Sequence, residues 1–182
     1  MSLQKPKMLL HICCAPCSTA VIERLRDEFD ITGYFYDPNI HPEEEYIRRL
    51  EETKGLYNKL SIPLIEAQYD AEIWFELTDN LKHEPEGGKR CELCYDMRLE
   101  KAAGFAKENG FDIFTTVLSI SPHKKAAVIN SIGKRLSEKY CIKFYEADFK
   151  KKDGFKRSLE LSWEYSLYRQ GYCGCVYSKR HL

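Results

Sequence analysis

Short apolar runs alternate with longer amphipathic stretches along almost the whole chain, and this alternation constrains the fold more than any other feature. Leu9 to Ile12 is a continuous apolar run, as expected of a strand buried on both faces of a parallel sheet. Helical periodicity follows at about 18–28. Further strands are expected at about 31–36, 63–67, 111–118 and 141–145, and further helices at about 42–60, 70–81, 91–110, 121–136 and 155–168.

This order of elements predicts an α/β fold with one Rossmann-like, mainly parallel sheet and helices on both faces. The length of 182 residues and the 43% hydrophobic content suit a single domain, residues 1–182. No apolar run approaches the ~18 residues of a membrane span, and no signal peptide is recognisable at the start. We therefore expect a cytoplasmic protein with no membrane partner.

Cysteines gather where the first predicted strand ends. Cys13, Cys14 and Cys17 stand within five residues at this strand-to-helix turn. Ligands of open α/β sheets bind at the carboxyl ends of strands, so three cysteines here favour a site for a soft metal. Asp37 ends the second predicted strand and should lie beside them, where it either forms a turn before Pro38 or serves a metal or acid role.

A second pair of cysteines, Cys91 and Cys94, is expected at the start of a long helix. Residues three apart share a helix face, so both sulfurs can reach one metal. The helix N-terminus, with Lys89 and Arg90, is expected to lower the pKa of both thiols. Together with the first three cysteines this gives more thiols than one structural zinc requires. An iron–sulfur cluster with sulfur left for a second metal or a redox pair suits them better.

The last two cysteines form a C-x-C motif, Cys173-Gly174-Cys175. Such a pair closes only a small, strained disulfide of the easily reduced, catalytic kind, or ligates a second metal, or consists simply of two buried cysteines. Cys141 stands alone at the start of a predicted strand, where a buried structural thiol is expected. In a cytoplasmic protein, eight cysteines favour metal or redox chemistry over a structural disulfide framework.

The formal net charge is zero, but its distribution is uneven. Residues 1–90 hold 11 Lys and Arg against 17 Asp and Glu, and residues 91–182 reverse these numbers. Basic residues with interleaved aromatic ones in the second half suit an anionic partner such as RNA, or simply a solvated surface.

Several motifs together resemble the QueH-type epoxyqueuosine reductases, and the resemblance covers nearly the whole chain. These motifs are His11–Ser18, Tyr36–Ile40, Arg90–Tyr95, Ser121–Lys124 and Tyr168–Cys175. The resemblance implies reduction of the epoxide of epoxyqueuosine, at the wobble position of a tRNA, to queuosine. It also implies a 4Fe-4S cluster, a neighbouring iron or other divalent metal, and an electron donor that the sequence does not identify.

The resemblance also implies roles for single residues. The cluster ligands correspond to Cys13, Cys14, Cys91 and Cys94. Cys173 and Cys175 correspond to a redox-active pair, while Cys17 and Asp37 are candidates for the second metal, Asp37 also for a catalytic role. We further expect tRNA to contact Lys124, Lys125, Lys150, Lys151 and Lys152.

Three other functions are compatible with parts of the sequence. A zinc-binding RNA-associated module would use some of the cysteines, and a thiol–disulfide oxidoreductase would leave the first three idle. The turn after the first strand also resembles the nucleotide-binding loop of the PP-loop fold, which would suit a tRNA-modifying enzyme of that type. However, residues 13–18 contain no glycine to cradle a phosphate.

Overall fold

The computed structural model describes residues 4–179. Within these residues, five strands form one parallel sheet in the order β3-β2-β1-β4-β5. Their bounds are β1 Lys7–Ile12, β2 Asp30–Phe35, β3 Leu64–Glu66, β4 Ile113–Thr116 and β5 Lys143–Phe144. The predicted α/β class is confirmed.

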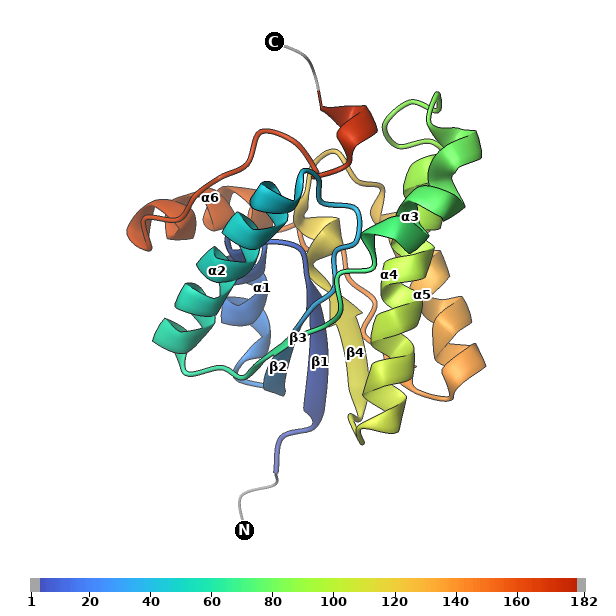
Figure 1. The fold of residues 1–182 in the computed structure, drawn as a ribbon. Helices are drawn as coiled ribbons and strands as arrows, with labels where there is room; N and C mark the ends of the chain where they lie inside the picture. The colour runs from blue at the N-terminus through green and yellow to red at the C-terminus, as the bar shows by residue number, and fades with distance from the viewer. Residues whose placement is uncertain (1–3, 180–182) are drawn as a thin grey trace.

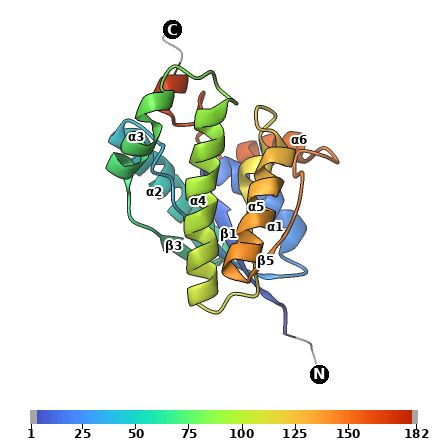
Figure 2. The ribbon, with the colours of Figure 1, turned by 90° about the vertical axis from the view of Figure 1, so that its right-hand side faces the viewer.

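In the described part of the chain, six α-helices connect and cover the strands. They are α1 Ala15–Leu25, α2 Glu43–Leu60, α3 Ala71–Thr78, α4 Lys89–Glu108, α5 Ala126–Tyr140 and α6 Gly154–Glu164. Single 3₁₀ turns lie at Asp79–Leu81, Val117–Ile120 and Val176–Ser178. Figure 1 shows α1, α2 and α6 on one face of the sheet and α4 and α5 on the other, and Figure 2 views the face that α4 and α5 cover.

The middle strand β1 is buried on both faces, as its continuous apolar run predicts. Met8, Leu9, Leu10 and Ile12 are all fully buried, between β2 on one side and β4 on the other. His11 is also fully buried, and its ring bonds to Thr116 Oγ1 (2.8 Å) and to the carbonyl oxygen of Tyr36 (3.2 Å). This histidine therefore helps to hold three strand ends together in the core.

The ends of several elements differ from the sequence-based expectation. Helix α1 begins at Ala15 rather than near residue 18, because Pro16 fits the first helical turn, where no backbone N–H is needed. Cys141 caps α5 in the left-handed conformation (φ 48°) and is exposed, so the prediction of a buried thiol in a strand is wrong. Cys141 ends helix α5 at the surface, and β5 begins only at Lys143.

The carboxyl ends of the strands position the candidate site. The turns after β1, β2 and β4 all open at this edge of the sheet. The segment after α6 then crosses the same edge toward α3, which brings the C-terminal cysteines to it (Figure 1). Among residues 4–179 no helix is long and apolar enough to cross a membrane.

Candidate metal and redox site

The first three cysteines form a compact group in the turn between β1 and α1. The sulfur atoms of Cys13, Cys14 and Cys17 lie within 4.8 Å of one another. Cys14 and Cys17 are joined as a disulfide, with their Cα atoms 5.5 Å apart. Burial raises the pKa of the Cys13 thiol, and the nearby carboxylate of Asp37 acts in the same direction. With the disulfide reduced, this group offers three thiols to one metal centre.

Cys91 and Cys94 lie in the first two turns of α4, as predicted, and both are buried. The backbone N–H of Gly87 donates to Cys91 Sγ at 3.2 Å. The expectation that the helix start and its basic residues lower the thiol pKa values is wrong. Burial is the largest effect, and it raises the pKa of both thiols despite the nearby Arg90 and Arg98. A bound metal would supply the positive charge that favours the thiolates.

The C-x-C segment is fixed to the loop after β2 and to helix α2. Arg49, only 2% exposed, donates to the carbonyl oxygens of Cys173 and Tyr172 at 3.1 Å each. The backbone N–H of His41 donates to the carbonyl oxygen of Gly174 at 2.8 Å, and the Tyr172 hydroxyl donates to that of His41. These bonds join segments more than 120 residues apart.

Gly174 meets two requirements at once. Its φ of +109° lies in the region that disfavours residues with a side chain. A Cβ atom at this position would also lie 2.8 Å from the Ile40 side chain. The segment can therefore approach the β2 loop this closely only with glycine between its two cysteines.

Cys173 and Cys175 interact directly, and their thiol pKa values shift in opposite directions. A hydrogen bond from the Cys175 thiol lowers the pKa of Cys173 to about 5, against the opposing effect of burial. The same contact raises the pKa of Cys175. One thiolate beside one thiol is the state from which a dithiol reacts as a nucleophile and then closes a disulfide.

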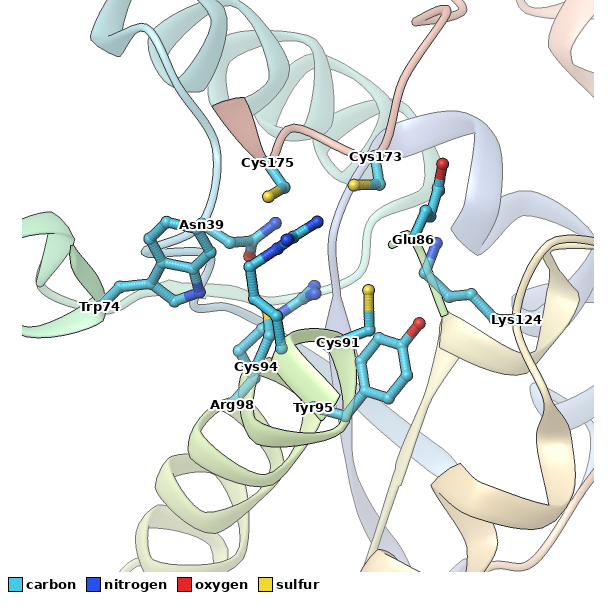
Figure 3. Close-up of a pocket in the computed structure, with 11 residues that line it drawn as sticks. Asn39, Trp74, Glu86, Cys91, Cys94, Tyr95, Arg98, Lys124, Cys173 and Cys175 are labelled. Atoms are coloured by element: carbon cyan, nitrogen blue, oxygen red, sulfur yellow. The ribbon is translucent and has the colours of Figure 1, made fainter. Parts of the chain in front are cut away.

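The start of α4 and the C-x-C segment converge on one pocket (Figure 3). Its cysteines are Cys91 and Cys94 from α4 and Cys173 and Cys175 from the C-terminal segment. The rest of its lining consists of Asn39, Trp74, Glu86, Arg90, Tyr95, Arg98 and Lys124. Within the described residues, the first cysteine group does not line this pocket, and neither do Lys125 and Lys150–Lys152.

A buried ion pair connects the two cysteine groups. Arg98 Nη2 donates to Asp37 Oδ1, and the two side chains are 2% and 0% exposed. Burial raises the pKa of Asp37 to about 6, with Arg98 opposing the shift. Burial disfavours the charge of Arg98, but Asp37, Cys94 and Cys13 together raise its pKa. The positive charge of Arg98 therefore interacts with Asp37 after β2, with Cys13 of the first cysteine group and with Cys94 of α4.

Sequence reasoning missed Arg49, Trp74 and Arg98. Arg98 stands four residues after Cys94, and this spacing on one helix face could have indicated it. Arg49 and Trp74 carry no such signal, because their contacts with the C-terminal segment depend on how distant parts of the chain pack.

Comparisons with known proteins agree with the sequence motifs. The family model described as "Epoxyqueuosine reductase QueH" matches residues 8–181. The Epoxyqueuosine reductase QueH of Histophilus somni is 47% identical over 176 residues, which cover 96% of this chain and 72% of that protein. The protein of the same name from Streptococcus pyogenes is 43% identical over 182 residues, covering 97% and 71%, and that from Thermotoga maritima is 39% identical over 175 residues, covering 94% and 89%.

Solved structures confirm the fold at low sequence identity. The U34-tRNA thiolase NcsA from Methanococcus maripaludis, solved with its [4Fe-4S] cluster, superposes with a TM-score of 0.62 at 14% identity, over 97% of this chain and 62% of that one. A predicted tRNA methyltransferase subunit from Methanocaldococcus jannaschii gives a TM-score of 0.57 at 14% identity, over 86% and 76%. The expected likeness to a PP-loop fold is confirmed at the level of the fold.

The family model and the relatives cover almost the whole chain, including the cysteine motifs that the structure brings together at one edge of the sheet. This chain belongs to the QueH family of epoxyqueuosine reductases and is an oxidoreductase.

Proposed function

We propose that this chain reduces epoxyqueuosine at the wobble position of tRNA to queuosine, with a cysteine-bound 4Fe-4S cluster and a neighbouring iron or other divalent metal. The observation that carries the proposal is the convergence of Cys91, Cys94, Cys173 and Cys175 on one pocket. An enzyme that reduces its substrate needs an electron-transferring group next to that substrate. The four cysteines can either bind such a group as metal ligands or transfer electrons themselves as a dithiol.

The donor set fits such a group. The first cysteine group and the pocket together offer sulfur ligands, with Asp37 as the carboxylate between them. Asp37 Oδ2 and Asn39 Oδ1 are buried and have no hydrogen-bond partner among the described side chains and backbone. Sulfur-rich donors select iron–sulfur clusters or zinc, and a buried unpaired carboxylate oxygen suits a divalent cation.

Cys13, Cys14, Cys91 and Cys94 would hold the cluster, and Cys17 and Asp37 the second metal. This assignment requires the Cys14–Cys17 disulfide to be reduced first. When bound, the metal group supplies a Lewis acid for the epoxide oxygen and one-electron transfers.

The reaction removes the epoxide oxygen. Both C–O bonds break, an alkene remains, and the oxygen leaves as water with the uptake of two electrons and two protons. As the Cys173 thiolate and the Cys175 thiol close to a disulfide, they can provide both electrons and one of the two protons. The second proton must come from another group, and an electron donor of the cell then reduces the disulfide.

Asp37 does not line the pocket but pairs with Arg98, which does, and this position suits proton transfer toward the pocket. Its pKa of about 6 lies close to neutral pH, where a carboxyl group exchanges protons most readily. Lys124 lines the pocket and provides a positive charge beside Cys173, whose thiolate it favours. The same lysine can also meet a phosphate of the tRNA.

Anaerobic reconstitution tests the cofactor and the activity together. Protein reduced with a thiol and loaded with iron and sulfide should show acid-labile sulfide and a visible band that bleaches on reduction. Loaded protein should convert epoxyqueuosine to queuosine in tRNA, measured by mass spectrometry of the digested nucleosides, and Cys173→Ala should abolish turnover. Zinc alone, with no iron uptake, would favour the zinc-binding module and contradict the proposed cofactor.

The lysine contacts are tested by the salt dependence of tRNA binding. Each phosphate contact contributes roughly 0.7–0.9 to the slope of log affinity against log salt. Substituting Lys124 and Lys125, or Lys150–Lys152, by glutamine should flatten this slope. Lys134→Gln, on α5, is the control, because Lys134 already pairs with Glu146. An unchanged slope in both sets would remove these lysines from the tRNA interface.

A further inference from the structure

Three buried N–H groups at the pocket have no hydrogen-bond partner within residues 4–179. They are Trp74 Nε1 from α3 and Arg90 Nε and Arg98 Nε from α4. All three residues line the pocket that also holds the four cysteines. Buried N–H groups in native proteins are nearly always paired, so three unpaired donors around one pocket point to a bound group that accepts hydrogen bonds.

Of these three residues, Trp74 has the best-defined surroundings. Its side chain is 1% exposed and packs with Cys94 and Cys175 in one buried cluster. Figure 3 shows the ring nitrogen on the side of Cys94 and Arg98.

Aromatic neighbours hold the Trp74 ring in this orientation. The His41 ring packs against it at a tilt of 49° with a centroid distance of 4.9 Å, and the Tyr177 ring stacks at 6.0 Å with an interplanar angle of 23°. His41 belongs to the loop that binds the C-x-C segment, and Tyr177 follows that segment. The direction of the Trp74 N–H is therefore set by the same elements that complete the pocket.

Sulfur accepts hydrogen bonds, and donors to the sulfur atoms of a metal centre change its electronic properties. A donated N–H withdraws electron density from the sulfur and favours the more negative, reduced state of the centre. Arg98 is already engaged with Asp37 and also contacts the Cys94 thiol, and Arg90 donates to the carbonyl oxygens of Leu81, Lys82 and Glu84. Trp74 has no other polar task for its side chain within the described chain.

We propose that the Trp74 N–H donates a hydrogen bond to the sulfur of Cys94 in the metal-loaded protein and thereby raises the reduction potential of the bound centre. Trp74 is a positioning residue that acts through Cys94. The proposal rests on the proposed function in so far as the centre is a cluster, but the hydrogen bond itself requires only a metal thiolate at Cys94.

The chain contains two tryptophans, which permits a matched pair of variants. Trp74→Phe removes the N–H and keeps most of the ring, whereas Trp163→Phe makes the same change at a side chain that is 83% exposed. We expect the two variants to bind the same amounts of iron and sulfide. The midpoint potential, measured by anaerobic optical titration, should shift to more negative values only in Trp74→Phe.

Two further measurements separate the hydrogen bond from packing and from the identity of the cofactor. In a Trp163→Phe background, replacing tryptophan biosynthetically by its benzothiophene analogue changes only position 74, and it removes the donor while keeping the ring shape. Protein loaded with Co²⁺ alone should show its thiolate-to-cobalt charge-transfer band at lower energy when the donor is absent.

The outcomes are distinct. Equal potentials and equal cobalt bands in the Trp74 and Trp163 variants would overturn the proposal. A shift in unfolding midpoint without a shift in potential or band would show that Trp74 only packs, and would overturn it as well. Wild-type protein that takes up no iron and sulfide would contradict the proposed cofactor, while the cobalt band would still decide the role of Trp74.

Discussion

The two cysteine groups of this enzyme are assembled in different ways. Cys13, Cys14 and Cys17 are brought together by one strand-to-helix turn, in which Pro16 starts the helix and the strand beneath is fully buried. Every contact that defines the group spans only a few residues. Such a site forms wherever β1 and α1 form.

The pocket cysteines depend on long-range packing instead. Cys91 and Cys94 share the start of α4, but Cys173 and Cys175 reach them only because Arg49 and the β2 loop bind the C-terminal segment. This difference shows that the pocket cysteines are the group whose arrangement mutations far away in the sequence can disrupt. The buried pair of Asp37 and Arg98 is where the two halves meet.

The largest effect is expected from breaking this connection. Asp37→Ala leaves the guanidinium of Arg98 buried without its carboxylate, which should lower the free energy of unfolding of the metal-free protein by about 3–5 kcal/mol. The double variant Asp37→Leu with Arg98→Met should recover much of this loss. Guanidinium denaturation measures both.

Glu146→Ala is the control for this change, because it breaks the exposed pair with Lys134, whose side chains are 48% and 61% exposed. Exposed pairs contribute only about 0–1 kcal/mol. If Asp37→Ala were as mild as Glu146→Ala, the ion pair would not connect the two halves energetically.

Releasing the C-terminal segment should be nearly as damaging. Arg49→Met leaves the carbonyl oxygens of Tyr172 and Cys173 unpaired and removes the ion-pair partner of Glu45, at a cost of about 3 kcal/mol. Amide hydrogen exchange should accelerate around residues 168–176 but not in the β1–α1 turn. Lys54→Met, on the same helix but in exposed ion pairs, should leave exchange there unaltered. Equal acceleration of exchange in residues 168–176 and in the β1–α1 turn would contradict the conclusion that the two cysteine groups are assembled independently.

The acid strength of Cys173 tests the pairing within the C-x-C segment. In reduced, metal-free protein its alkylation by iodoacetamide should rise through pH 5 and be level at pH 7, because the thiolate predominates above its pKa. Cys175→Ala removes the donated hydrogen bond and should return the pKa toward about 8.5, leaving about 3% thiolate at pH 7. A Cys173 rate that still follows a midpoint near pH 5 in Cys175→Ala would assign the shift to another group.

The smallest expected change concerns the glycine between the two cysteines. Gly174→Ala forces a side chain into the +109° conformation and against Ile40, at a cost of about 1–2 kcal/mol. Because the strain falls on the segment that carries Cys173, turnover should fall several-fold. Gly171→Ala, where a Cβ would meet no atom within 4 Å, should be nearly neutral in stability and turnover. Equal effects at both glycines would mean that the close approach to the β2 loop is unimportant.

The sequence by itself determined the α/β class, the position of the first cysteine group at a strand end, and the placement of Cys91 and Cys94 at a helix start. These features follow from local rules: residue periodicity, helical spacing and the conformation that proline allows. Such rules need no knowledge of the rest of the chain, and for that reason they hold here.

Tertiary structure alone decided how the groups are arranged and what environment each cysteine has. It placed the C-x-C segment against α4 through Arg49, turned Trp74 toward Cys94, and left Cys141 at the surface. It also reversed the expected pKa shift of Cys91 and Cys94, because burial outweighs the neighbouring positive charges. Burial and contacts across more than 120 residues arise from the packing of the whole chain, so no local pattern encodes them.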